Sequence, residues 1–313
     1  MMRVSHQPPA MPVLSVRHIT TYRYRQPVSF GEHRMMLRPR DSFDQKLLES
    51  RLAITPEPIE LRWMLDVFGN CVAIAQFGRR ADELRFESSI WLDHTPSNTP
   101  DFQIEDYAKT YPFAYAPEEM PDLAPIITPQ YPDPDQEVHR WVRRFLSKGR
   151  PTDTGTLLMT LTHAVKESFT YERRGQQGTR EPALTLKLGR GSCRDLTLLM
   201  IEAVRSLGLA ARFVSGYLYV PSRDGPTHLG GGSTHAWAQV YLPGAGWVEF
   251  DPTNAIVGNR DLIRVAVARD PSQAIPLSGT YWGSADDCTS MTVEVRVRTV
   301  TEPEATSAAT AEA

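Results

Sequence analysis

Apolar and polar positions alternate with a two-residue period along the first hundred residues, which is the pattern of half-buried β-strands. The alternation is clearest over residues 13–28, and Phe68-Gly69-Asn70 has the composition of a hairpin turn. Because no helical periodicity interrupts these segments, the pattern predicts an all-β sandwich or barrel. The expected strands span residues 13–28, 34–37, 47–54, 61–67, 71–76 and 83–92.

Prolines change the pattern in the next segment, where they recur between Pro96 and Pro134. Proline has no N–H to donate, so this composition predicts an extended linker that lies over the surface. Apolar residues at helical spacing then predict a helix over residues 135–148. A second helix is expected to follow, with Asp153 as its N-cap.

A buried helix is predicted at residues 196–207, where apolar residues fall at steps of three and four before Gly208. Cys193 lies at the start of this helix. The unpaired N–H groups and the positive end of the helix dipole favour an anion there, which gives the thiol a physical reason to ionise. Gly189 and Gly191 allow the chain to turn tightly just before it and leave the sulfur open to a substrate.

Strands are predicted after this helix at residues 212–220, 236–242 and 247–250, and a late strand at 291–300. A helix on an antiparallel sheet makes the second half α+β. The glycine-rich segment 221–233 is either a lid over the site or a flexible surface loop. The expected organisation is a β-rich domain over residues 1–110, a proline-rich linker over 111–134, a core over 135–300 that includes the late strand, and a disordered tail over 301–313.

His235 and Asp251 are the candidate partners of Cys193. A cysteine nucleophile needs a base, and imidazole titrates in a suitable range; the base needs a carboxylate or amide to orient it. His235 begins one predicted strand and Asp251 ends the next. A symmetric four-residue turn over 243–246 would point Asp251 away from His235, because successive side chains alternate between faces. We therefore predict an odd-numbered connection or a β-bulge in this hairpin.

Four further residues are candidates for holding an oxyanion or lining the site: Tyr171, Ser192, Asp195 and Trp237. Asp195 lies in the first helical turn, where a structural cap is favoured over a catalytic role. Tyr171 could donate to an oxyanion, or equally be a buried interface residue. No metal or other cofactor is expected, because the sequence has no C-x-x-C, no H-x-x-x-H and no dense carboxylate loop.

The composition, with 41% hydrophobic and 23% charged residues, is that of an ordinary globular protein, and the formal net charge of −3 gives no reason to expect nucleic acid or an anionic membrane as a partner. The three cysteines are too few for a disulfide framework, which fits a reducing compartment. No segment has the form of a signal peptide or membrane span. We expect a cytoplasmic protein that acts on a protein or peptide.

The chain resembles the bacterial transglutaminase-like family. The core of that family is similar to residues 191–195 (GSCRD), 211–217 (ARFVSGY), 234–237 (THAW) and 246–254 (GWVEFDPTN), and its N-terminal β domain to residues 18–28, 37–40 and 66–70. The resemblance implies a papain-like core with Cys193, His235 and Asp251 as a triad. The position after the cysteine, often glutamine in the family, is Arg194 here. Calcium dependence is not expected.

The reaction stays open at this level, since the family includes cross-linking enzymes, peptidases and glycan-removing amidases. Attack of Cys193 on a carboxamide or peptide carbonyl would give an acyl-enzyme. Water would resolve it in a peptidase or amidase, and an amine would resolve it in a transglutaminase. We favour hydrolysis because water is always present and the sequence shows no amine site. The alternative from another class is a non-catalytic binding module with a relic triad.

Overall fold

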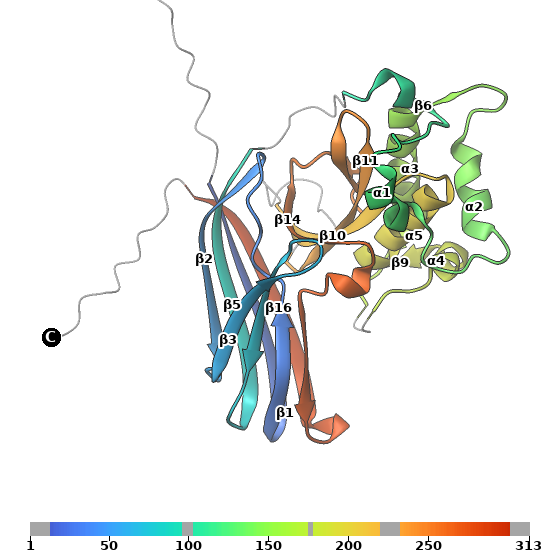
Figure 1. Ribbon diagram of the computed structural model, residues 1–313. Coiled ribbons are helices and arrows are strands. Elements are labelled where there is room, and N and C mark those ends of the chain that lie inside the picture. The colour runs from blue at the N-terminus through green and yellow to red at the C-terminus, as the bar shows by residue number, and fades with distance from the viewer. Residues whose placement is uncertain (1–12, 96–102, 175–177, 220–231, 301–313) are drawn as a thin grey trace, which may run out of the picture.

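The computed structural model describes residues 13–95, 103–174, 178–219 and 232–300. Figure 1 shows a β-sheet layer formed by the first part of the chain beside a second part in which helices cover a smaller sheet. The predicted α+β class, with a β-rich first part and a core that bears a helix on an antiparallel sheet, is confirmed.

The long strand β1 (Val13–Met35) organises the N-terminal sheet. Its first half pairs with β16 and β5, and its second half pairs with β15 and β4. Register shifts between Arg23 and Val28 separate the halves, and apolar residues from both enclose a core that includes Phe30 and Phe86. The other strands of the sheet are β2 (Gln45–Thr55), β3 (Glu60–Leu65), β4 (Cys71–Gln76), β5 (Ala81–His94), β15 (Leu277–Trp282) and β16 (Cys288–Val300).

The turn expected between residues 68 and 70 is confirmed. Asp66 Oδ1 accepts from the N–H groups of Phe68 and Asn70 at 2.9 and 2.8 Å, and Gly69 has a φ of +74° that favours glycine. The turn joins β3 to β4, which pair in register from Leu65 and Cys71 outward.

The late strand belongs to the N-terminal sheet and not, as expected, to the core. The expected core over residues 135–300 included it, but β16 pairs with β1 from Tyr24 to Val13 and so belongs to the N-terminal sheet. An alternating pattern of apolar and polar residues identifies a strand, but it does not identify the strand with which it pairs. In the folded chain, the long strand β1 offers an edge along which β16 pairs. The other proposed domain limits stay a prediction.

The proline-rich segment also differs from an extended linker. It contains the helix α1 (Met120–Ile127), in which Pro121 occupies the first turn, where a missing N–H costs nothing. The helix expected over 135–148 is shorter, with α2 (Glu137–Val142) followed by a 3-10 turn at Arg143–Phe145. Asp153 caps α3 (Thr154–Ser168) as expected, accepting from the Thr156 N–H at 2.7 Å.

The second sheet has the strand order β13-β12-β11-β10-β14 within the described residues, and its core forms against α5 and α3. Short pairs β6 with β7 and β8 with β9 flank it, and 3-10 turns lie at Asp106–Ala108, Pro271–Gln273 and Ala285–Asp287. The remaining elements are α4 (Pro182–Leu188), α5 (Cys193–Ser206), β6 (Thr110–Tyr111), β7 (Thr152–Asp153), β8 (Thr170–Tyr171), β9 (Arg190–Gly191), β10 (Ala211–Leu218), β11 (His235–Leu242), β12 (Gly246–Asp251), β13 (Ile256–Val257) and β14 (Leu262–Ala268).

Two side-chain amides of the N-terminal part, one at the start of β2 and one in the turn between β3 and β4, bind the edge strand β14. Gln45 donates to the Arg264 carbonyl at 2.9 Å and accepts from the Arg264 N–H at 3.0 Å. Asn70 makes the same pair of bonds with Val267, at 2.7 and 2.9 Å. Unpaired edge groups invite pairing with other chains, so the N-terminal part of this protein protects one edge of the second sheet.

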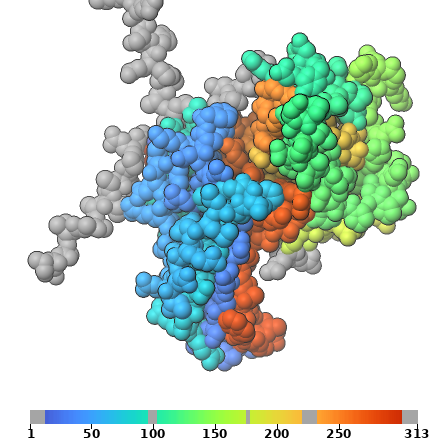
Figure 2. All heavy atoms as spheres, viewed as in Figure 1, coloured from blue at the N-terminus to red at the C-terminus, as the bar shows by residue number. Residues whose placement is uncertain are grey.

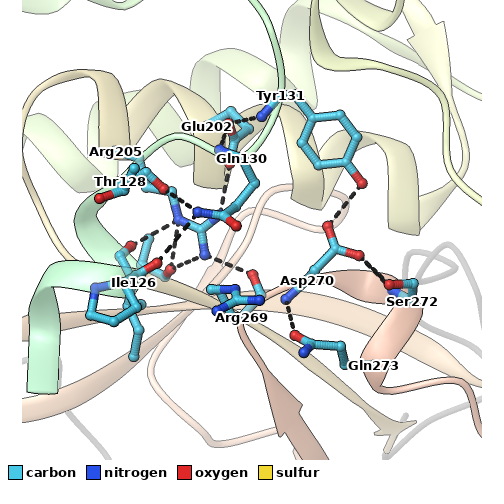
Figure 3. A network of polar contacts seen from close by, with 12 residues as sticks. Ile126, Thr128, Gln130, Tyr131, Glu202, Arg205, Arg269, Asp270, Ser272 and Gln273 are labelled. Carbon is cyan, nitrogen blue, oxygen red and sulfur yellow. Dashed lines mark hydrogen bonds and ion pairs between the residues drawn. The ribbon is translucent and has the colours of Figure 1, made fainter.

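A buried charge pair on α5 fixes the proline-rich segment against the second sheet (Figure 3). The Arg205 side chain is fully buried and pairs with Glu202 at 2.7 Å. Glu202 also accepts from the N–H of Gln130 at 2.8 Å. Arg205 further donates to three backbone carbonyls, those of Ile126, Ala211 and Arg269. These bonds satisfy a charge that would otherwise be costly to bury, and they join three separate parts of the chain.

Candidate active site

Cys193 is the first residue of α5 and is only 8% exposed. Gly191, two residues earlier, pairs with Tyr171 in the parallel strands β8 and β9. A Cβ at position 191 would lie 2.8 Å from Asp195 Cβ, so the tight approach before the helix needs glycine. The first four N–H groups of a helix have no acceptor within it. The thiol therefore lies where backbone N–H groups and the helix dipole favour negative charge.

The hairpin of β11 and β12 brings His235 and Asp251 together. Leu242 pairs with Gly246, so the connection holds three residues, 243–245. Ala238 pairs with Phe250, and the next position places Asp251 opposite Trp237, on the face that also carries His235. The predicted odd-numbered connection is confirmed. Gly246, with a φ of +73°, serves as the first residue of β12 instead of the last residue of the turn.

His235 and Asp251 form a buried ion pair. The imidazole Nε2 donates to Asp251 Oδ2 at 2.7 Å, and neither side chain is exposed. Burial lowers the pKa of His235, but the carboxylate of Asp251 and then the thiol of Cys193 outweigh it and raise the pKa to about 10. Burial raises the pKa of Asp251, but His235 and the hydrogen bonds to the carboxylate bring it below the usual value. The charged form of the pair is therefore favoured at neutral pH.

Asn254 belongs to this cluster and was not predicted as a site residue. Its Nδ2 donates to Asp251 Oδ2 at 2.8 Å, and the Thr253 N–H donates to Oδ1 at 2.9 Å. These bonds hold the carboxylate toward His235. The available signal was local: an amide three residues after an aspartate at a strand end fits a turn stabilised by that aspartate.

The second imidazole nitrogen is the one available to the thiol. His235 Nδ1 is buried and makes no hydrogen bond of standard geometry with the described residues. Cys193 nevertheless interacts with the imidazole strongly enough to contribute to its raised pKa. Because Nε2 is held by Asp251, a proton passing between the imidazole and the thiol would use Nδ1.

Trp237 covers the imidazole. The two rings are stacked, with centroids 6.1 Å apart and an angle of 28° between their planes, and the indole is fully buried. Gly216, opposite His235 on β10, provides the space: a Cβ there would lie 2.6 Å from the Trp237 ring and 2.1 Å from the Ile263 carbonyl oxygen. Because the buried indole excludes water, the local dielectric constant is low, which strengthens the ion pair of His235 and Asp251.

Comparison with known proteins fits this geometry. The pattern of the bacterial transglutaminase-like N-terminal region matches residues 14–93, and that of the transglutaminase-like superfamily matches residues 139–252. The uncharacterized protein Rv2569c of Mycobacterium tuberculosis (strain H37Rv) is 31% identical over 286 residues, which cover 87% of this chain and 88% of the relative. The chain belongs to the transglutaminase-like superfamily.

Two more relatives of this transglutaminase-like chain cover nearly its whole length. The uncharacterized protein ML0607 of Mycobacterium leprae is 27% identical over 286 residues, covering 90% of this chain and 98% of the relative. A crystal structure from Cytophaga hutchinsonii, of a protein proposed to be a cysteine protease, has a TM-score of 0.68 at 18% identity and covers 92% of this chain and 91% of that one. The fold is that of a β-rich domain joined to a papain-like, transglutaminase-like core.

Asp195 and Ser192 shape the start of the helix in this transglutaminase-like core. Asp195 Oδ2 accepts from the N–H and the hydroxyl of Ser192, at 2.9 and 2.8 Å. Asp195 Oδ1 pairs with Arg174 at 2.6 Å and accepts from the Arg180 N–H at 2.8 Å. All these partners lie in the turn and the segment before the helix. Asp195 therefore acts as a cap that also binds Arg174 and Arg180, in line with the structural role favoured from the sequence.

Tyr171 lies near the thiol of this transglutaminase-like site. Burial raises its pKa, and so does the electrostatic influence of Cys193, while Arg173 and Arg194 oppose the shift. Tyr171 therefore lies within electrostatic range of the Cys193 sulfur, and it stays a candidate oxyanion donor. Arg194 is half-buried and makes no ion pair with the described residues.

The remaining expectations for this transglutaminase-like chain concern the segment considered as a lid, the C-terminal tail, metal binding and location. Residues 221–231 of the segment considered as a lid, and the tail 301–313, lie outside the described residues. Among the described residues, no cluster of three His, Cys, Asp or Glu side chains could hold a metal ion. None of the described helices combines the length and apolar character needed to cross a membrane. The cytoplasmic location stays a prediction.

Proposed function

We propose that this protein catalyses cysteine-dependent acyl transfer on a peptide or carboxamide substrate, with Cys193, His235 and Asp251 as a triad. One observation carries the proposal: a buried imidazole, bound to a buried carboxylate at 2.7 Å and with a pKa raised to about 10, interacts with a thiol at a helix N-terminus. An imidazolium beside a cysteine favours the thiolate, which is the nucleophilic form.

In the first half of the reaction the sulfur of Cys193 attacks the substrate carbonyl carbon. The oxyanion that forms is held by the backbone N–H of Cys193, with Tyr171 as a second candidate donor. His235 then gives its Nδ1 proton to the departing nitrogen, the bond between carbon and nitrogen breaks, and a thioester remains on Cys193. Asp251 keeps the ring oriented throughout.

In the second half, neutral His235 accepts a proton from the incoming nucleophile, which attacks the thioester and releases Cys193. We propose that this nucleophile is water, so that the enzyme is a peptidase or amidase. Cys193 is only 8% exposed and the imidazole is covered by Trp237, which leaves water as the smallest competent nucleophile. Amine transfer, the reaction of a protein-glutamine transglutaminase, is the second candidate because the same thioester would serve it.

The first test is alkylation of Cys193 by iodoacetamide across pH, read by mass spectrometry of the cysteine-containing peptides. Wild type should label at Cys193 well below pH 8, and His235→Ala should remove that advantage. His163→Ala, at an exposed histidine on α3, is the matched control. Cys71 and Cys288 are also free thiols and serve as internal references. Labelling of Cys193 no faster than theirs would favour a non-catalytic binding module.

The second test separates the two reactions. The protein is incubated with a library of glutamine-containing peptides, with and without a labelled primary amine. New peptide N-termini or ammonia release without amine incorporation would support hydrolysis, and incorporation of the label would support amine transfer. Cys193→Ala should abolish every product, which excludes a contaminating enzyme.

A further inference from the structure

Strand β3 is an edge of the N-terminal sheet. Among the described residues it pairs only with β4, and all six of its residues are exposed. Figure 1 places β3 in the sheet layer, and the light-blue spheres of this part of the chain lie on the visible surface in Figure 2. An edge strand presents unpaired N–H and C=O groups, which can pair with a strand from another chain.

The edge is apolar on one face. Alternate positions from Ile59 to Leu65 are large hydrophobic residues, and side chains two apart share a face. Their exposed fractions are 72% for Ile59, 39% for Leu61, 46% for Trp63 and 61% for Leu65. Contiguous exposed apolar side chains of this kind mark interaction surfaces in soluble proteins. The other face carries Glu60 and Arg62, so the strand has one negative and one positive side chain beside its apolar row.

These two charges make β3 complementary to itself. When a second copy lies antiparallel with Leu61 opposite Leu61, Glu60 of each copy faces Arg62 of the other. The same register places Ile59 opposite Trp63 twice, a β-branched and aromatic pair that stabilises sheets. Within the described residues Glu60 has no ion pair, and Arg62 has one long ion pair, with Glu32 at 3.8 Å, and a 4.0 Å contact with Met64 Sδ. Both charges are therefore available to the second copy.

Backbone direction agrees with this register. The Asp66 N–H donates to the Asn70 carbonyl at 3.1 Å, in the register that continues the pairing of β3 with β4, so the N–H groups of even-numbered residues point toward β4. N–H groups alternate in direction along a strand, and those of Leu61 and Trp63 point to the open edge. A register centred on Arg62 would bring two Arg62 side chains together, and one centred on Trp63 would place Glu60 opposite Asp66. Both put like charges opposite each other, which destabilises a sheet.

We infer that two copies of this protein associate through β3, forming an antiparallel pair centred on Leu61 that extends the N-terminal sheet across both chains. The contact is symmetric, since the same residues serve on both sides. Affinity comes from the backbone hydrogen bonds and the apolar row, and the Glu60 and Arg62 pairs fix the register. This inference is independent of the chemistry proposed at Cys193.

Charge reversal on the full chain tests the register. Sedimentation equilibrium should find a concentration-dependent dimer in wild type. Glu60→Arg and Arg62→Glu should each weaken it about tenfold or more, because each converts two attractive pairs into two repulsive ones. The double variant, with both substitutions, should restore the dimer. Glu49→Arg and Arg51→Glu, at an ion pair on the opposite edge strand β2, are the matched controls and should leave the affinity unchanged.

Cross-linking gives a second readout. Leu61→Cys places two thiols opposite each other in the pair, and mild oxidation with diamide should join the copies by a disulfide. Leu65→Cys, on the same face but opposite residue 57 of the other copy, should not form one. A monomer at every concentration, a dimer insensitive to both single reversals, or single reversals that the double variant fails to rescue would each overturn the inference.

Discussion

Replacement of Asp251 by asparagine is the most informative single change in this protein. Asp251 Oδ2 accepts from His235 Nε2 and Asn254 Nδ2, and Oδ1 accepts from the Thr253 N–H. Asparagine keeps the shape but supplies one oxygen and one NH₂ group. In either orientation the NH₂ group faces an N–H donor, so Asp251→Asn removes both the charge and an acceptor.

The expected size of the effect of Asp251→Asn follows from the pKa of His235. The pKa of His235 is about 10 against an ordinary value of 6.5. That difference corresponds to about 5 kcal/mol in favour of the imidazolium, at about 1.4 kcal/mol per pH unit. Asp251 contributes more to the raised pKa of His235 than Cys193 does, so we assign at least half of this free energy to Asp251. Loss of about 2–3 kcal/mol lowers the ratio of the thiolate–imidazolium pair to the neutral thiol–imidazole pair by about 50-fold.

The assay is the rate of iodoacetamide labelling of Cys193 between pH 5 and 9. Wild type should react at pH 6, whereas Asp251→Asn should react there more slowly, by up to about 50-fold, and approach wild type only in the pH range of a free thiol. Asp270→Asn, which removes a carboxylate that binds Tyr131 and Ser272 away from the site, is the control. Circular dichroism of each variant establishes that the fold is retained.

One result would refute this reasoning. If folded Asp251→Asn labels within about threefold of wild type at pH 6, the carboxylate does not maintain the imidazolium. The raised pKa of His235 would then have another origin, and the assignment of Asp251 to the triad would fall.

Three further predictions concern stability, each measured as the free energy of unfolding in urea. Gly216→Ala should cost about 1–3 kcal/mol, because its methyl group meets the ring of Trp237; an unchanged stability would contradict the close contact. Arg205→Met should cost about 3–5 kcal/mol by leaving Glu202 buried without its partner, and adding Glu202→Gln should recover part of the loss. Burial lowers the pKa of His18 to about 4, so stability should fall between pH 6.5 and 4, by up to about 1.4 kcal/mol per pH unit, and His18→Gln should flatten that slope.

Local patterns along the chain were enough to locate most of the long elements and to show the likeness of the core to a known family. Side-chain periodicity is local, so alternation located most of the long strands but not β14 or β15. Three- and four-residue spacing located α5 with Cys193 at its start, and Asp153 marked a helix cap. The odd number of residues in the connection between β11 and β12 could also be predicted. Side chains alternate strictly between the faces of a sheet, so His235 and Asp251 could share a face only across an odd connection.

Which elements pair or pack together depends on contacts between residues far apart in the chain. Pairing of β16 with β1 joins residues far apart in sequence, and no local pattern names a partner strand. Likewise the bonds of Gln45 and Asn70 to β14 depend on how two sheets dock. The stacking of Trp237 on His235 and the anchoring of Asp251 by Asn254 set the electrostatics of the site. Such interactions act through space over a few ångströms, so only the folded chain specifies them.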